Sequence, residues 1–237
     1  MSRKAKTTLT TVAVLSTLYA ALSALGVAGI ESGTGGVIYR LIIIAALLLS
    51  CSRAFAGAGR GGALLAGALG LGAFAVFEIY SFAYIYLYGG SPADLTVGNY
   101  TRNCAYLFFM AAALYLIPPV FKAHKAIRAV LGVGSSVALG FIFYAIIASN
   151  YPLLAYSALA ITVLCLLSAV VLIKHSRLFA ISIIVVCLLG TASRLLLMTD
   201  YNMGWHLRDT LISLYPAAYL LIGYALTRLR KEAANNE

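Results

Sequence analysis

Long apolar windows separated by short polar connectors run along the whole chain. A window of about 20 apolar residues is long enough to cross the roughly 30 Å hydrocarbon core of a bilayer. Eight such windows occur, at 8–30, 37–56, 62–88, 104–122, 129–149, 152–173, 178–199 and 209–228. The connectors are too short for a separate folded domain. The pattern therefore predicts an all-α, polytopic membrane protein: one domain of eight transmembrane helices over 1–231, then a short cytoplasmic tail, 232–237.

The composition agrees with this prediction. Hydrophobic residues make up 62% of the 237 residues and charged residues 10%, and the mean hydropathy is +0.96. A soluble domain of this length could not bury so much apolar surface. The first window resembles a secretory signal peptide, but it is too long and has no Ala-x-Ala exit. We expect it to be an uncleaved first helix.

Basic residues predict the orientation. With the N-terminus inside, thirteen of the seventeen basic residues fall on the cytoplasmic side, whereas Arg102 and Arg208 fall outside. The thirteen are Arg3, Lys4, Lys6, Arg53, Arg60, Lys122, Lys125, Arg128, Lys174, Arg177, Arg228, Arg230 and Lys231. The positive-inside rule therefore predicts a bacterial inner-membrane protein with both termini cytoplasmic. The net charge of +10 is thus an orientation signal, and no nucleic-acid partner is expected.

A repeat of four helices is a candidate feature. In each half an outer-loop Asp is followed six residues later by a Tyr, and then by a Tyr-Leu pair in an apolar run. The matching positions are Asp94, Tyr100 and Tyr106 in the first half, and Asp209, Tyr215 and Tyr219 in the second. Because both halves would begin inside, the pattern predicts a 4+4 parallel repeat.

Two stripes of small residues predict helix packing. Gly62, Ala66 and Gly70 recur every four residues in the third window. Gly132, Ser136 and Gly140 do the same in the fifth. Small residues at this spacing let two backbones approach closely in a membrane, so both stripes are expected at helix–helix contacts.

One carboxylate stands out in the apolar stretch AVFEIYSFAYIYLYGG, residues 75–90. Glu78 lies at membrane depth, in the same half of the bilayer as Arg40 and Arg194. A charge at this depth requires a partner or a watery cavity. Arg194 is the favoured partner and Arg40 the second choice, since Arg40 could also snorkel outward. One interpretation is a purely structural pair, and the other is an outward-facing polar cavity that binds a ligand.

Three more residues are candidates for that ligand site. Tyr80 lies deep enough to need a hydrogen-bond partner and is placed in the same cavity. The last outer loop holds His206 and Asp209, which could cover the cavity or take part in acid–base chemistry. The alternative is a solvated loop in which Asp209 caps the last helix.

Several kinds of site are not expected. The four cysteines fall singly, with no zinc-site spacing, and no metal-ligand or nucleotide motif occurs. His124 and His175 lie in basic inner turns, which disfavours a bis-His haem. No Lys lies within the bundle to hold retinal. We therefore predict no cofactor and no metal, and no catalytic residue is identified.

The two half-repeats carry a resemblance. ADLTVGNYTRNCAYLFF (93–109) and RDTLISLYPAAYLLIGYAL (208–226), in a chain of eight apolar helices, look like multi-spanning bacterial membrane sensor modules. Such modules usually precede diguanylate cyclase or histidine kinase domains. Only six residues follow Lys231, so we expect no output domain here. The resemblance implies ligand sensing, with signalling through a partner membrane or cytoplasmic protein.

Two rival functions remain open at this point. A secondary transporter would use Glu78 as its coupling or substrate residue. An integral-membrane enzyme acting on a lipid would use Glu78 or the loop of His206 and Asp209. Such an enzyme would need a second carboxylate in the membrane or a nucleophile and base at a suitable spacing, and the sequence shows neither. Small-molecule sensing is therefore the leading hypothesis.

Overall fold

The protein is described here as a computed structural model that covers residue 14 and residues 33–89, 96–117, 124–148, 151–198, 211 and 214–234. These residues form seven α-helices and no strand. The helices are α2 (Gly33–Phe55), α3 (Gly62–Phe82), α4 (Thr96–Leu116), α5 (His124–Ile147), α6 (Tyr151–Leu172), α7 (Arg177–Met198) and α9 (Tyr215–Ala234). The all-α class is confirmed. Apart from residue 14, the first predicted span, 8–30, lies outside the described residues.

The helix ends follow local chemistry that hydropathy does not detect. α4 begins at Thr96, eight residues before the predicted span, because its first two turns are polar yet helical. It ends at Leu116, just before Pro118-Pro119, and not at 122; a proline disfavours helical geometry in the preceding residue. α9 continues to Ala234, beyond the predicted end at 228, because charged residues at the membrane surface can still be helical.

Short helical turns flank α3. The single 3₁₀ turn η1 (Ala58–Arg60) links it to α2, and the chain passes through Gly61 at φ 155°. At its other end α3 widens into the π-helical turn η2 (Ala83–Leu87), where the Tyr88 amide donates to the Ala83 carbonyl. A π-turn inserts an extra residue per turn and often occurs near functional sites.

Three of the described helices are long and apolar enough to cross a membrane. Their apolar segments are Val37–Phe55, Gly62–Leu87 and Lys125–Ala145. Two further apolar stretches, Tyr156–Leu172 and Arg177–Ala192, are shorter. These helices are consistent with a membrane protein, in agreement with the composition.

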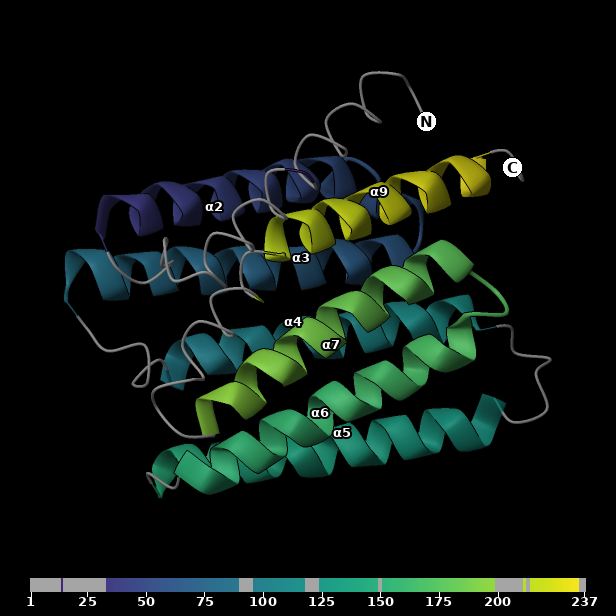
Figure 1. Ribbon diagram of the computed structural model, residues 1–237. Helices are drawn as coiled ribbons and strands as arrows, with labels where there is room; N and C mark the ends of the chain where they lie inside the picture. The colour runs from purple at the N-terminus through teal and green to yellow at the C-terminus, as the bar shows by residue number, and fades with distance from the viewer. Residues whose placement is uncertain are drawn as a thin grey trace.

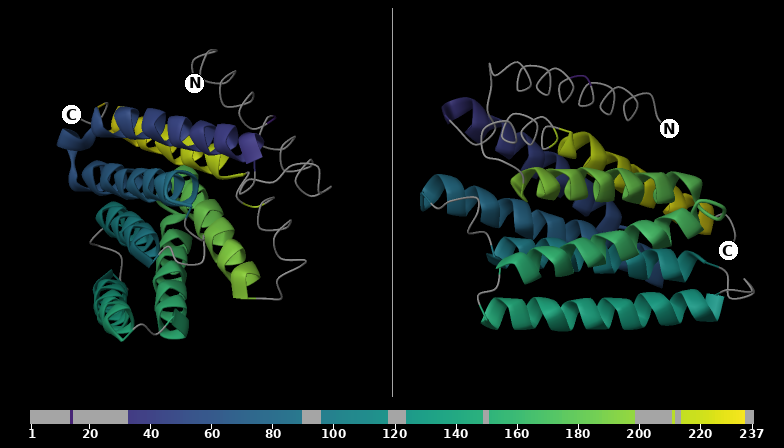
Figure 2. Two further views of the ribbon diagram at one scale, coloured as in Figure 1. Left: turned by 90° about the vertical axis from the view of Figure 1, so that its left-hand side faces the viewer. Right: turned by 60° about the horizontal axis from the view of Figure 1, so that its bottom comes forward.

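The described helices run across the view in Figure 1, and Figure 2 shows that α6 and α7 are oblique to α2, α3 and α9. α3 packs on α2 and α4, α9 packs on α2 and α7, and α6 packs on α4, α5 and α7. α5 lies at one edge of the bundle, which both views in Figure 2 show. The interior between α3, α4, α7 and α9 is filled by large side chains. The largest fully buried ones include Tyr106, Tyr219, Phe74, Phe109 and Phe179.

The stripe on α3 is a packing surface, as predicted. A Cβ at Gly62 would lie 2.9 Å from the Tyr115 ring, and one at Gly70 would lie 2.8 Å from the Phe109 ring, both on α4. Ala66, between them, is buried. These small residues let α4 aromatic rings lie directly on the α3 backbone.

The stripe on α5 does not contact another described helix, so the described residues do not support the prediction for it. A Cβ at Gly132 or Gly140 would meet no described atom within 4 Å, and Ser136 is exposed. α5 faces α6 with a different side, on which Gly134 lies against Leu164. The spacing of small residues does not say which side of a helix faces its neighbour.

Basic side chains gather at one end of the bundle. That end holds the α2–α3 turn, the α6–α7 turn and the C-terminal end of α9 (Figure 1). Its described, exposed basic residues are Arg53, Lys125, Lys174, Arg177, Arg228 and Lys231. This grouping is what the count of basic residues along the sequence leads one to expect.

Candidate functional site

Glu78 lies on the C-terminal half of α3, where the helix touches both α2 and α9. The helix forms around it because Ala and Leu, which are strong helix formers, dominate its sequence and outweigh its four glycines. Only 1% of Glu78 is exposed. A carboxylate is thus held in the interior of a bundle whose surroundings are otherwise mostly apolar.

The Glu78 carboxylate binds one residue from each of two neighbouring helices. Arg40 Nη1 on α2 donates to Glu78 Oε2 at 2.9 Å, and the arginine is itself only 4% exposed. The Tyr219 hydroxyl on α9 donates to Glu78 Oε1 at 3.0 Å. We call Arg40, Glu78 and Tyr219 the Glu78 cluster. It connects the consecutive helices α2 and α3 to α9, which lies far along the sequence.

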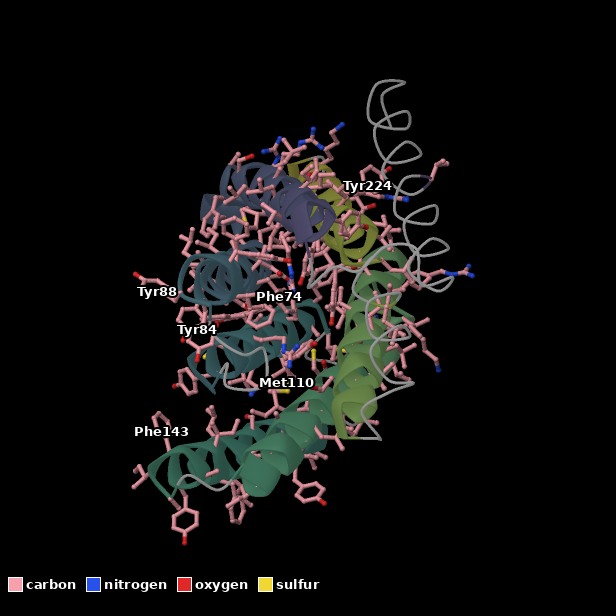
Figure 3. The ribbon with its side chains drawn as sticks, turned by 60° about the vertical axis from the view of Figure 1, so that its left-hand side comes forward. Phe74, Tyr84, Tyr88, Met110, Phe143 and Tyr224 are labelled. Carbon is pink, nitrogen blue, oxygen red and sulfur yellow. The ribbon has the colours of Figure 1, made fainter. Side chains whose placement is uncertain are left out.

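Aromatic rings form the wall on the inner side of this cluster. Phe74, one helical turn before Glu78, lies between Tyr219 and Tyr106, with ring centroids 5.2 Å and 5.5 Å away. Figure 3 shows Phe74 inside the bundle, surrounded by side chains. Tyr215 stacks on Tyr219 at 5.5 Å. The rings exclude solvent and hold the Tyr219 hydroxyl toward the carboxylate.

α7 closes this wall from the opposite side. A Cβ at Gly190 would collide with the Tyr106 hydroxyl and would lie 3.9 Å from the Tyr215 hydroxyl. The α7 backbone therefore passes directly beside two tyrosine hydroxyls. Glycine is required here because no larger residue would leave room for the Tyr106 side chain.

The burial of the Arg40–Glu78 pair has a large energetic consequence. Each charge has lost most of its water, and the opposite charge at 2.9 Å compensates for much of that loss. Removing one charge would deprive the other of this compensation in the interior. Both carboxylate oxygens already accept one hydrogen bond, but a carboxylate oxygen can accept a second. The cluster can therefore bind a further donor without breaking either bond.

The structure answers which arginine pairs with Glu78. The partner is Arg40, the second choice from the sequence, because α2 packs directly on α3 whereas α7 packs mainly on α6 and α9. Depth along a helix places a residue in the membrane but does not identify neighbouring helices. The Arg194 side chain lies outside the described side chains.

Tyr80 is not part of the Glu78 cluster. It stacks on Tyr84 at 5.8 Å, and its ring lies beside Gly98 of α4. Two positions along a helix correspond to about 200° of rotation, so Tyr80 and Glu78 face nearly opposite sides of α3. Tyr84 and Tyr88 lie toward the edge of the molecule (Figure 3). His206 and Asp209 lie outside the described residues.

One residue of the Glu78 cluster and one buried charge outside it were missed from the sequence. Tyr219 was noticed only as part of the repeat, although the Tyr215–Tyr219 spacing of four residues places both rings on one helix face. Arg102 was assigned to an outer loop, but it lies within α4 and is 9% exposed. Its guanidinium carbon lies 5.0 Å from the centroid of the Phe77 ring, a cation–π contact. Tyr219 could have been found by its spacing, whereas Arg102 depended on where α4 begins.

Within the described residues, no group of three or more His, Cys, Asp or Glu could hold a metal ion. No family model matches the chain, and neither the curated proteins nor the solved structures contain a match. What the site does must therefore be argued from its own geometry.

Proposed function

We propose that this chain is an eight-span protein of the bacterial inner membrane that senses a small molecule. The ligand would enter from the outer side and bind at the Glu78 cluster. The observation that carries this proposal is the fully buried Arg40–Glu78 pair, which lies in two helices apolar enough to cross a membrane. Ionisable residues inside a membrane bundle are costly and mark functional sites more often than not.

The position of Tyr219 favours sensing in particular. Tyr219 donates to Glu78 near the beginning of α9, and the same helix ends with Arg228 and Glu232, which are exposed. A ligand that donates a further hydrogen bond to Glu78 would weaken the bond from Tyr219 without having to displace it, and would thereby change how α9 packs. A partner protein at the inner end of α9 would read that change. This requires the ligand to bind one packing of α9 better than the other.

The 4+4 parallel repeat forms part of the same proposal. Tyr106 and Tyr219 begin the Tyr-Leu pairs of the two half-repeats, and both pack against Phe74. Two parallel halves related by an axis along the membrane normal would bring matching residues together near that axis. The site would then lie where the halves meet.

The topology can be tested by cysteine labelling in intact cells. The four native cysteines are replaced first, and single cysteines are then placed at positions 94 and 235. We expect an impermeant thiol reagent to label position 94 only. Labelling of position 235 without position 94 would overturn the eight-span arrangement with both termini inside.

Ligand binding can be tested by thermal unfolding in detergent. The panel contains small polyols, carboxylates and amines, each titrated against the parent and against Glu78→Gln. A saturable rise in melting temperature that the variant loses supports the proposal. If no solute gives a saturable rise, or if Glu78→Gln keeps it, the binding function is wrong. Proton-coupled uptake of the same solute into vesicles would identify a transporter instead of a sensor.

A further inference from the structure

Ser81 differs from every other fully or nearly fully buried Ser or Thr in the described residues. The others donate to a carbonyl one turn earlier in their own helix, as Ser168 does to the Cys165 carbonyl at 2.7 Å. The same holds for Ser50, Ser157, Thr162 and Ser182. Ser81 is 0% exposed, and its Oγ has no hydrogen-bond partner among the described residues. A buried hydroxyl without a partner costs about 1–3 kcal/mol and therefore needs an explanation.

The place of Ser81 in α3 suggests that explanation. It lies three residues after Glu78, so its side chain is on a neighbouring part of the same helix surface, one turn further outward. Residues three apart on a helix have Cβ atoms about 5–6 Å apart. One small group between the Ser81 hydroxyl and the Glu78 carboxylate could bond to both. The helix widens into the π-turn η2 only two residues later, at Ala83.

The chemistry of the two groups defines what can lie between them. Glu78 as a carboxylate only accepts hydrogen bonds, so the bridging group must donate one. The Ser81 hydroxyl has a proton to donate, so the same group must also accept. A hydroxyl group does both.

The bridging molecule should also be neutral. Arg40 and Glu78 already cancel each other's charge at 2.9 Å. A charged ligand would leave an uncompensated charge among fully buried side chains, which is strongly unfavourable. This argument excludes small carboxylates and amines in favour of uncharged molecules.

We propose that Ser81 is a further binding residue of the Glu78 cluster, and that the site takes a neutral hydroxyl group, supplied by water or by a polyol. If a polyol supplies the hydroxyl group, this inference rests on the proposed function. If water supplies it, the inference does not require ligand sensing.

The test compares Ser81→Ala with the matched control Ser168→Ala, which removes a buried hydroxyl that is bonded within its own helix. Thermal unfolding of the whole chain in detergent is measured with and without millimolar glycerol, myo-inositol or glucose. We expect Ser81→Ala to melt about 2–4 °C lower than Ser168→Ala, because a bridging hydrogen bond is lost. We also expect a saturable stabilisation of the parent and of Ser168→Ala by one polyol, and its loss in Ser81→Ala.

The outcomes separate this inference from the proposed function. If Ser81→Ala melts lower but no polyol stabilises the parent, the bridging group is water; Ser81 keeps its role and sensing of a polyol fails. If Ser81→Ala melts at or above Ser168→Ala, and any polyol stabilises both equally, the role of Ser81 is overturned, although ligand binding elsewhere in the cluster survives.

Discussion

Two ion pairs of the same length lie in very different parts of the molecule. Arg40–Glu78 joins α2 to α3 in the interior, and Arg228–Glu232 lies on the surface of α9, each at 2.9 Å. The side chains of the first pair are 5% and 1% exposed, whereas those of the second are 60% and 55% exposed. Water screens the second pair and hydrates either partner if the other is lost. The first pair has no such alternative, so burial and not distance determines its importance.

The contrast between interior and surface also distinguishes the small-residue stripes of α3 and α5. Both helices carry three small residues at four-residue spacing, but those of α3 face α4 and two of those of α5 meet no described neighbour. Of the residues in their apolar windows, 56% are buried in α3 and 24% in α5. A pattern that is equally clear in two segments thus has an energetic role inside the bundle and little role at its edge.

The largest effect should come from removing the buried negative charge. Glu78→Gln keeps the shape of the side chain but removes the negative charge that Arg40 faces in the interior. We expect a loss of about 3–5 kcal/mol in the free energy of unfolding. Denaturant or thermal unfolding in detergent would measure it. Stability equal to that of the parent would mean that water reaches the pair.

The control for this prediction removes both charges together. In Glu78→Gln/Arg40→Gln the two amides can still bond to each other and no buried charge remains. We expect the double variant to recover a large part of the loss of Glu78→Gln. If the double variant is less stable than the parent by the sum of the two single losses, the pair is not coupled.

Next in size is the comparison of the two stripes. Gly70→Leu would place a large side chain where Phe109 already lies, and we expect it to cost about 1–3 kcal/mol or more. Ser136→Leu on α5 should change stability by less than about 0.5 kcal/mol in a detergent-solubilised monomer. The melting temperatures of the two variants would show whether only the α3 stripe is a packing surface. Equal losses would show that the α5 stripe is also a packing surface.

A smaller effect is expected at Tyr219. Tyr219→Phe removes the hydrogen bond to Glu78 but keeps the ring against Phe74. Hydrogen bonds between membrane helices contribute on average about 0.6 kcal/mol and at most about 1.7, and we expect a loss in this range. Tyr224→Phe, on the same helix, is the matched control and should be neutral. A neutral Tyr219→Phe would indicate that Glu78 finds another donor.

The smallest effect is expected at the exposed pair. Glu232→Gln removes the partner of Arg228, which remains hydrated. The change should be below about 0.5 kcal/mol and should decrease further in high salt. A loss as large as that of Glu78→Gln would mean that the C-terminal end of α9 is covered, and the contrast between the two pairs would disappear.

The sequence was sufficient to predict local features, such as where helices form and which residues need a partner. It predicted the helices because a run of about 20 apolar residues is a local signal, and the described helices begin and end near most of the predicted limits. It failed at the beginning of α4, where polar residues such as Arg102 are helical. It predicted that Glu78 needs a charged partner at the same depth, since the cost of a buried charge is a property of the residue itself.

The choice among candidates required the tertiary structure. Arg40 and Arg194 are equivalent by depth, and only the packing of α2 on α3 makes Arg40 the partner. Tyr219 reaches Glu78 from 141 positions further along the chain, a contact that no local pattern encodes. By itself the sequence determined which residues must avoid lipid or find a partner, because that depends on the polarity of each side chain. Which residues meet was decided by how the helices pack, because it depends on the rotation and neighbours of every helix at once.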